Sequence, residues 1–445
     1  MLRILRAAGL AVTAVIGSCA SPTQQVRHVH IEATLRHEER AIAAAPAALH
    51  ARLTERFSLA DVLAVVHADN PGLHAARSRV RAALAEARVA GRLPDLVAKA
   101  ELWGAPLLQP YAIDRADAVM LGVRQEFPLA SFAPSKRAAA TAMANLERVD
   151  LIGRARELAR DVADAFIAYH HARQERALHI EHIALTQQSI DVVRAAQVAG
   201  RASEADVATA LVVLSKAHGE LSLIDADEAA ARAALNAWMA RPIDAILGEP
   251  AAVSTAAPVN DSATQNNHAV LRSSAQAMHS EATAKVVQDE AKLPVLMAGI
   301  DYWLMPTAAD PHGYGAMVQV SLPWLNHARD ADVDVARRRA EAAHSELRST
   351  TLAVDRALAE ARARLAAART GLRIVATEQI PNAEHAVAAS KNAFISGAAD
   401  ARSLLMANEL LLEARMRQVH LRRDEALARI AVAQITGTEE FAHGT

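Results

Sequence analysis

The sequence predicts a mainly α-helical protein with a small β part, built from two copies of one unit. Three observations predict this fold class. Two very long helical stretches carry a coiled-coil stripe, two pairs of short alternating segments interrupt the helices, and landmark residues recur at nearly constant spacing. Each long helix would measure about 95 Å at 1.5 Å per residue, which is too long for one compact domain.

The first unit is expected over residues 55–240. Its first helix is predicted to start after Ser58, whose hydroxyl caps it while Asp61 stands at the third helical position. The remaining elements are a helix from Pro71 to about Arg92, extended stretches at 93–106 and 116–128 that form a hairpin over 95–127, and helices over about 135–199 and 203–239. Gly200 is expected to turn the chain between the last two helices.

The second unit is expected over residues 268–437 and repeats this order. Its elements are a helix over about 269–291, extended stretches at 295–305 and 314–322 that form a hairpin over 295–322, and helices over about 328–396 and 401–435. Three landmarks recur: Leu93-Pro94 at Leu293-Pro294, Phe127-Pro128 at Leu322-Pro323, and Gly200 at Gly397. The second unit departs in one respect, because no Asn-Pro pair stands near Leu271. Residues 241–267, rich in Pro, Ala, Ser and Asn, are predicted to be a linker.

The two long helices are expected to pack as coiled coils. Apolar residues alternate at spacings of four and three, which keeps one seam facing a partner. The seam of the first unit is Leu151, Ala155, Leu158, Val162, Ala165, Tyr169 and Ala172. That of the second is Val354, Leu358, Ala361, Leu365, Ala368, Leu372 and Val375.

The extended stretches alternate with period two, which is typical of strands that face lipid on one side and water on the other. Val119, Leu121 and Val123 share one face, whereas Met120, Gly122, Arg124 and Glu126 share the opposite face. A half-buried hairpin of a soluble protein shows the same pattern, so both interpretations stay open. Aromatic residues favour the membrane, because eight of the 14 fall beside these stretches: Trp103, Tyr111, Phe127, Phe132, Tyr302, Trp303, Tyr314 and Trp324. Four strands cannot close a barrel, so several chains are expected to pool theirs.

The amino terminus is expected to target and anchor the chain. Residues 1–18 have the basic start and apolar core of a signal peptide, and Ile16-Gly17-Ser18-Cys19 resembles the lipobox of bacterial lipoproteins. The alternative is an ordinary cleavage site that happens to precede a cysteine. Residues 19–54 are expected to form a lipidated tether whose histidines are solvated, and 438–445 a tail.

Composition and motifs argue against several function classes. Lys and Arg number 48 against 50 Asp and Glu, so no basic excess indicates nucleic-acid binding. No catalytic motif occurs, Cys19 is the single cysteine, and neither an enzyme nor a cofactor other than the lipid on Cys19 is expected. Helix histidines at His170, His171, His179 and His182 are interpreted as solvated or partly buried, with no metal site.

The sequence resembles the TolC family of outer-membrane efflux channels over about residues 55–437. The resemblance lies in the lipobox, the double helix–hairpin–long-helix unit, Asn70-Pro71, Glu126-Phe127-Pro128-Leu129, Val320-Ser321-Leu322-Pro323-Trp324 and the two turn glycines. It implies a homotrimer whose twelve pooled strands form a barrel in the outer membrane, continued by an α-helical coiled-coil barrel across the periplasm. It also implies a periplasmic adaptor and an inner-membrane pump of the resistance–nodulation–division type as partners.

Two further expectations follow from the resemblance. Gln125-Glu126-Phe127-Pro128 and Ser135-Lys136-Arg137 resemble the branch that exports heavy-metal cations, although a glycine of that branch is missing between them. Related channels carry a ring of acidic residues just past the turn, which makes Glu204, Asp206 and Asp400 candidates for a periplasmic gate. Ordinary surface charge is the alternative for these three residues. For the whole chain, the alternative function is a lipid-anchored coiled-coil scaffold without a channel.

Overall fold

The computed structural model describes residues 46–105, 108, 113–128, 132–252, 264–306 and 308–437. The signal segment, Cys19, Tyr111 and the tail over 438–445 lie outside the described residues. So do most of the tether and the middle of the predicted linker.

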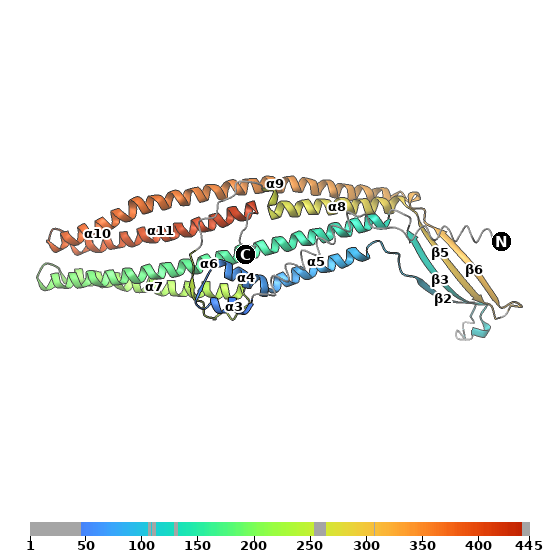
Figure 1. Cartoon of the computed structure of the whole chain (residues 1–445), viewed down its shortest axis with the longest axis horizontal. Coiled ribbons are helices and arrows are strands. Elements are labelled where there is room, and N and C mark those ends of the chain that lie inside the picture. The colour runs from blue at the N-terminus through green and yellow to red at the C-terminus, as the bar shows by residue number, and fades with distance from the viewer. Residues whose placement is uncertain are drawn as a thin grey trace. The chain divides into compact units, whose positions relative to one another are not determined.

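The helices and strands follow the predicted order (Figure 1). Those of the first repeat are α3 (Pro46–Arg52), β1 (Arg56–Phe57), α4 (Leu59–Asp69), α5 (Pro71–Val89), β2 (Val97–Trp103), β3 (Ala118–Pro128), α6 (Phe132–Val198) and α7 (Glu204–Trp238). A short strand β4 (Glu249–Pro250) follows. Those of the second repeat are α8 (His268–Lys292), β5 (Val295–Leu304), β6 (His312–Val320), α9 (Ala328–Ile374), a π-helix (Val375–Gln379), α10 (Ile380–Ile395) and α11 (Ala401–Thr436).

The chain divides into two compact units, and neither coincides with one repeat. Among the described residues, the first unit consists of Arg77–Asp150 and Arg272–Ser349. The second consists of the rest, chiefly Leu151–Leu271 and Thr350 onward. Each unit therefore contains an equivalent part of both repeats, so neither repeat forms a compact unit by itself.

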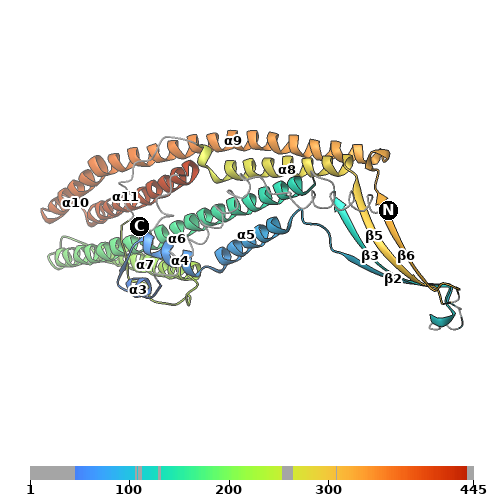
Figure 2. The same ribbon diagram turned by 45° about the vertical axis from the view of Figure 1, so that its right-hand side comes forward.

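The first unit contains a four-stranded antiparallel sheet in the order β2-β3-β5-β6 (Figure 1). Each repeat supplies one hairpin, and β3 pairs with β5 to join them. In the register, Leu121 stands opposite Tyr302, which stands opposite Tyr314. Both predicted hairpins are confirmed. Figure 2 shows α8 beside α9 in the same unit, where Glu281 pairs with His344 at 2.5 Å.

The second unit is built on α6, α7 and α11. The two predicted seams are buried or partly buried along their length, from Leu151 to Ala172 and from Val354 to Val375. The largest apolar cluster gathers side chains of α4, α6 and α7 around Phe57, Phe166 and Tyr169. Ser58 and Asp61 cap α4 reciprocally, as predicted.

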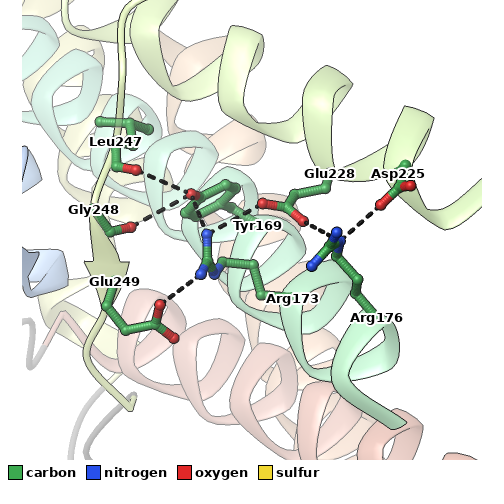
Figure 3. Close-up of polar contacts among 8 residues, drawn as sticks. All are labelled: Tyr169, Arg173, Arg176, Asp225, Glu228, Leu247, Gly248 and Glu249. Atoms are coloured by element: carbon green, nitrogen blue, oxygen red, sulfur yellow. Dashed lines mark hydrogen bonds and ion pairs between the residues drawn. The ribbon is translucent and has the colours of Figure 1, made fainter. Parts of the chain in front are cut away.

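The first residues after α7 pack against other parts of the second unit, although the sequence predicted a linker here. Strand β4 pairs in parallel with β1, and Leu247 is buried. Figure 3 shows the contacts that hold this segment: the Tyr169 hydroxyl lies 3.5 and 3.4 Å from the carbonyl oxygens of Leu247 and Gly248, and Arg173 pairs with Glu249 at 2.6 Å. These partners lie 76 to 79 residues away in sequence, so composition alone did not indicate them.

A second correction concerns the Asn-Pro pair that the second repeat lacks. In the first repeat, Asn70 accepts from the backbone N–H of Gly72 and donates to the Trp238 carbonyl. In the second, Asn267 accepts from the N–H of Ala269 and donates to the Ile435 carbonyl. All these positions differ by 197, as Gly200 and Gly397 do. The equivalent asparagine is therefore present four residues before Leu271, with His268 in place of proline.

The third correction is a π-helix inside the predicted helix over 328–396. Pro381 lies just after it, and proline lacks an N–H and crowds the carbonyl four residues earlier, which favours a wider turn. A π-turn closes its hydrogen bond one residue later than an α-turn, so it holds one extra residue. The offset between equivalent residues of the two repeats agrees with one extra residue. The seams of α6 and α9 match in phase when Leu158 is aligned with Val354, an offset of 196, whereas Gly200 and Gly397 beyond the π-helix are offset by 197.

Among the described residues, one helix, α7, is long and apolar enough by length and composition to cross a membrane. Its buried residues Ala210, Ala217 and Ile224 recur at intervals of seven, which is the spacing of a coiled-coil seam. Figures 1 and 2 show it running beside α6. Its outer side exposes Val212 and Leu223, at 68% and 69%. We interpret α7 as a coiled-coil helix with a second apolar side.

Alanine at either turn glycine should lower stability. Gly200 and Gly397 have φ of +71° and +78°, and no atom lies within 4 Å of a Cβ built on either residue. Gly200→Ala and Gly397→Ala should therefore each lower the free energy of unfolding by about 1–2 kcal/mol through backbone strain alone. Chemical denaturation of the purified protein measures this.

Gly219 provides the control, because it lies inside α7 with equally open space around it. Gly219→Ala should raise the free energy of unfolding, by up to about 1 kcal/mol. Equal effects at the three glycines would contradict the assignment of positive φ as the cause.

Candidate functional site

One face of the sheet is apolar and exposed. Directly opposed residues share a face, so the register groups the alternating side chains across all four strands. The exposed face carries Ala98, Ala100, Leu102, Leu121, Val123, Ile300, Tyr302, Tyr314, Ala316 and Val318. Leu121 is 53% exposed and Val318 70%. An apolar surface of this extent on a protein marks a contact with lipid or with another chain.

The opposite face is polar and less accessible. It carries Lys99, Glu101, Arg124 and Asp301, and Lys99 pairs with Glu101 at 2.6 Å. Asp301 is buried between two glycines of the neighbouring strands, and a Cβ on Gly122 would lie 2.0 Å from its Oδ1. The glycines leave room for bulky and charged side chains on this face. The predicted separation of the two faces is therefore confirmed.

The aromatic residues are divided between the two faces. Trp103 and Trp303 lie on the polar face, where the Trp103 indole N–H donates to Glu101 at 3.0 Å. Phe132 begins α6 and is buried. The exposed aromatic residues are Trp103 on the polar face, Tyr302 and Tyr314 on the apolar face, and Trp324 after β6. Tyr302 and Trp303 are neighbours in β5, so period-two alternation by itself places them on opposite faces.

Among the described residues, the sheet ends in two edge strands, each paired on one side only. β2 pairs only with β3, and β6 only with β5. Their outer N–H and C=O groups need partners wherever water is excluded, so another strand must pair with each edge in a membrane.

The two helix turns of the second unit are held together by a small apolar core and one hydrogen bond. Val193 and Ala196 of α6 pack with Phe394 and Leu404 of α10 and α11. Arg201 donates from its guanidinium to the Ile395 carbonyl at 2.9 Å. Both turn glycines have the positive φ that was predicted for them.

Two gate candidates are helix caps. Asp206 accepts from the backbone N–H and the hydroxyl of Ser203 at 2.8 and 2.7 Å, at the start of α7. Asp400 accepts from the N–H and hydroxyl of Ser403 at 2.9 and 2.6 Å, at the start of α11. These hydrogen bonds hold the pKa of each carboxyl below its ordinary value. Glu204 is exposed in the first turn of α7.

The caps explain why Asp206 had no acidic counterpart six residues after Gly397. Ser203 and Asp400 are equivalent, and so are Asp206 and Ser403, because both pairs differ by 197. The repeats use the same two residue types in exchanged order. Each cap therefore carries one carboxylate, displaced by three residues between the repeats.

The helix histidines are more deeply buried than expected. His171, His179 and His182 are 6–8% exposed, and with Thr186 and Ser189 they form a buried polar stretch of α6 between the apolar seam that ends at Ala172 and the buried Ile190 and Val193. His171 and His420 of α11 both lie against the Glu175 carboxylate, at 3.1 and 2.7 Å. Burial raises the pKa of Glu175, but the hydrogen bonds from the two histidines outweigh it and hold that pKa at about 2. The i,i+4 spacing of His171 and Glu175 is visible in the sequence, whereas His420 lies 245 residues beyond Glu175.

Residues 259–438 match the family model described as outer membrane efflux protein. No protein of curated function matches the chain. Three solved structures share the fold. The structure described as CusC, on folding and transmembrane channel formation, matches with a TM-score of 0.75 and 15% identity over 85% of this chain and 91% of that chain. The outer membrane protein VceC of Vibrio cholerae matches with 0.73 and 15% over 85% and 96%. The MtrE outer membrane channel of Neisseria gonorrhoeae matches with 0.70 and 16% over 87% and 91%.

Arginine placed on adjacent positions of β3 should distinguish the two faces. Leu121→Arg puts a charge on the exposed apolar face and should cost about 2–4 kcal/mol if this face meets the centre of a bilayer. Met120→Arg faces the polar side, near Lys99 and Glu101, and should cost less. Folding yield in detergent and urea unfolding from vesicles measure the difference. Equal cost at both positions would contradict a lipid-facing apolar side.

Proposed function

We propose that this chain is the outer-membrane subunit of a tripartite efflux system, and that three copies form one channel. The observation that carries the proposal is the four-stranded sheet with an exposed apolar face, a polar opposite face and two open edges. Lipid would cover the first face, substrates and water would pass along the second, and neighbouring copies would satisfy the edges.

The long helices support the same arrangement. α6 has 67 residues, about 100 Å at 1.5 Å per residue, which is enough to extend far from the membrane into the periplasm. The apolar outer side of α7 would pack against a neighbouring copy, just as its seam packs within the chain. The helices would then form a periplasmic tunnel that meets an adaptor and an inner-membrane pump of the resistance–nodulation–division type.

The competing function, a lipid-anchored coiled-coil scaffold, leaves the sheet unexplained. A scaffold has no use for an exposed apolar sheet face whose reverse side carries charged residues between glycines. It would gain nothing from two open edges, which invite aggregation. Mass measurement in detergent separates the two functions, because the channel requires a trimer.

We further propose that the acidic residues at the turns bias the periplasmic gate. Three copies of Glu204, Asp206 and Asp400 around one axis would concentrate negative potential and favour cations. Asp206 and Asp400 combine this role with capping, so their substitution by alanine alters the helix start and the charge together.

An exchange variant separates charge from capping. Ser203→Asp with Asp206→Ser copies the order found at Asp400 and Ser403, so α7 keeps its cap while the carboxylate moves by three residues. Asp206→Ala removes both. In planar bilayers Asp206→Ala should reduce cation preference, and the exchange variant should show a different conductance with unchanged thermal stability. Unchanged selectivity and conductance in both variants and in Asp400→Ala would exclude these residues from the gate.

We propose that Cys19 is lipidated and is the first residue of the mature chain. The proposal rests on Ile16-Gly17-Ser18-Cys19 and the absence of another cysteine from the sequence. Metabolic labelling with palmitate should mark the wild type and leave Cys19→Ser unlabelled. Equal labelling would refute it. Cys19→Ser should still reach the outer membrane as a trimer, because the strands supply a separate and larger attachment.

A further inference from the structure

We propose that His171, Glu175 and His420 bind one divalent transition-metal ion, which links α6 to α11. This site is independent of the channel proposal. All three residues belong to the second compact unit, two on α6 and one on α11. Their ligand atoms lie within 4.8 Å of one another.

The geometry suits three corners of a tetrahedron. His171 and Glu175 are four residues apart on one helix, so their side chains lie on the same face. The Nε2 atoms of His171 and His420 point at the same carboxylate oxygen, at 3.1 and 2.7 Å. Ligands about 2.0–2.1 Å from zinc stand about 3.3 Å apart in a tetrahedron. A metal ion would take the place of the hydrogens that now join these atoms.

The site opens on a cavity that favours cations and can supply a fourth ligand. The cavity has a volume of about 520 Å³ and is lined in part by Glu175 and His420 themselves. Its other charged or titratable lining residues are His179, His182, Lys216, Glu220, Glu409 and Glu413. Four carboxylates against one lysine give an excess of negative charge. Water from this cavity can complete the coordination, as in zinc sites with three protein ligands.

Burial is graded across the three ligands. The side chain of His171 is 9% exposed, that of Glu175 16% and that of His420 47%. His420 can therefore admit an ion from solvent, whereas the other two form a fixed base. Arg423 is the one opposing charge among the described contacts of the cluster, with its guanidinium 3.5 Å from His171 Nε2. It also pairs with Asp424 at 3.2 Å and would turn fully to that partner when a metal binds.

The helix packing does not require this cluster. Before the π-helix, equivalent residues of the two repeats are 196 positions apart in the sequence, so Ala367 and Gly371 are equivalent to His171 and Glu175. Beyond the turns the offset is 197, so Leu223 is equivalent to His420. The equivalent positions, two in the second repeat and one in the first, hold small or apolar residues, so the two histidines and the glutamate occur at only one of the two equivalent places.

The ligand set selects the class of metal. Imidazole nitrogens favour Zn²⁺, Co²⁺, Ni²⁺ and Cu²⁺, whereas Mg²⁺ and Ca²⁺ prefer a shell of oxygens. Two imidazoles and one carboxylate therefore predict binding of Zn²⁺ with strong preference over Mg²⁺.

Calorimetric titration of the full-length protein in detergent, without a histidine tag, tests the site with Zn²⁺ as the probe. His420→Gln and Glu175→Gln should each weaken one Zn²⁺ site per chain at least about tenfold. Zn²⁺ should raise the melting temperature of the wild type and raise it less in both variants, because the ion joins two helices. Co²⁺ should give visible absorption bands of a four-coordinate ion in the wild type that both variants lose.

His344→Gln is the matched control, because His344 pairs with Glu281 at 2.5 Å in the first compact unit and, within the part of the chain that the structure describes, no third metal ligand joins them. This variant should bind Zn²⁺ like the wild type, and Mg²⁺ should bind to none of the proteins at this site. Three results would each overturn the proposal: no Zn²⁺ site lost in His420→Gln, an equal loss in His344→Gln, or Co²⁺ spectra that the substitutions leave unchanged. A hydrogen-bonded His–Glu–His contact without metal affinity would produce the first of these.

Discussion

Backbone hydrogen-bonding groups must find protein partners wherever water is excluded, and this constraint governs both ends of the repeated unit. In the sheet, four strands satisfy one another but leave the outer groups of β2 and β6 without strand partners, so a single chain is incomplete as a membrane structure. At the helix starts, the same need is met locally by Ser203 with Asp206 and by Asp400 with Ser403. The proposed assembly would therefore depend on the strand edges, whereas the helix caps are complete within one chain.

Much of the fold could be predicted because its signals are periodic and long. Seams with spacings of four and three, strands with period two and glycines at equal positions identified the helices, both hairpins and the turns. Two features depended on contacts distant in sequence and were not predictable. They are the packing of Leu247 to Glu249 on Tyr169 and Arg173, and the approach of His420 to Glu175. The equivalence of Asn267 to Asn70 was not predicted for a different reason. The expected pattern included a following proline, which the capping role of Asn267 does not need.

The two repeats are alike in backbone and different in chemistry. Their caps, positive-φ turns and asparagine contacts coincide at a spacing of 197. The exchanged order of serine and aspartate conserves the cap while moving the charge, and buried polar residues from His171 to Ser189 interrupt the apolar packing of α6. The backbone constraint therefore leaves side chains free to diverge at equivalent positions, and the differences between the repeats indicate where function resides.

The π-helix at Val375–Gln379 has a consequence for how such a chain tolerates change. An extra residue in a long α-helix rotates everything beyond it by about 100° and would turn the seam away from its partner. A single wide turn confines that rotation to one place, so α10 regains the phase that α6 keeps without it. After a gene duplication, the two copies can thus gain or lose single residues and still bring their hairpin turns to the same level. Length drift in this helix is absorbed locally instead of being selected against.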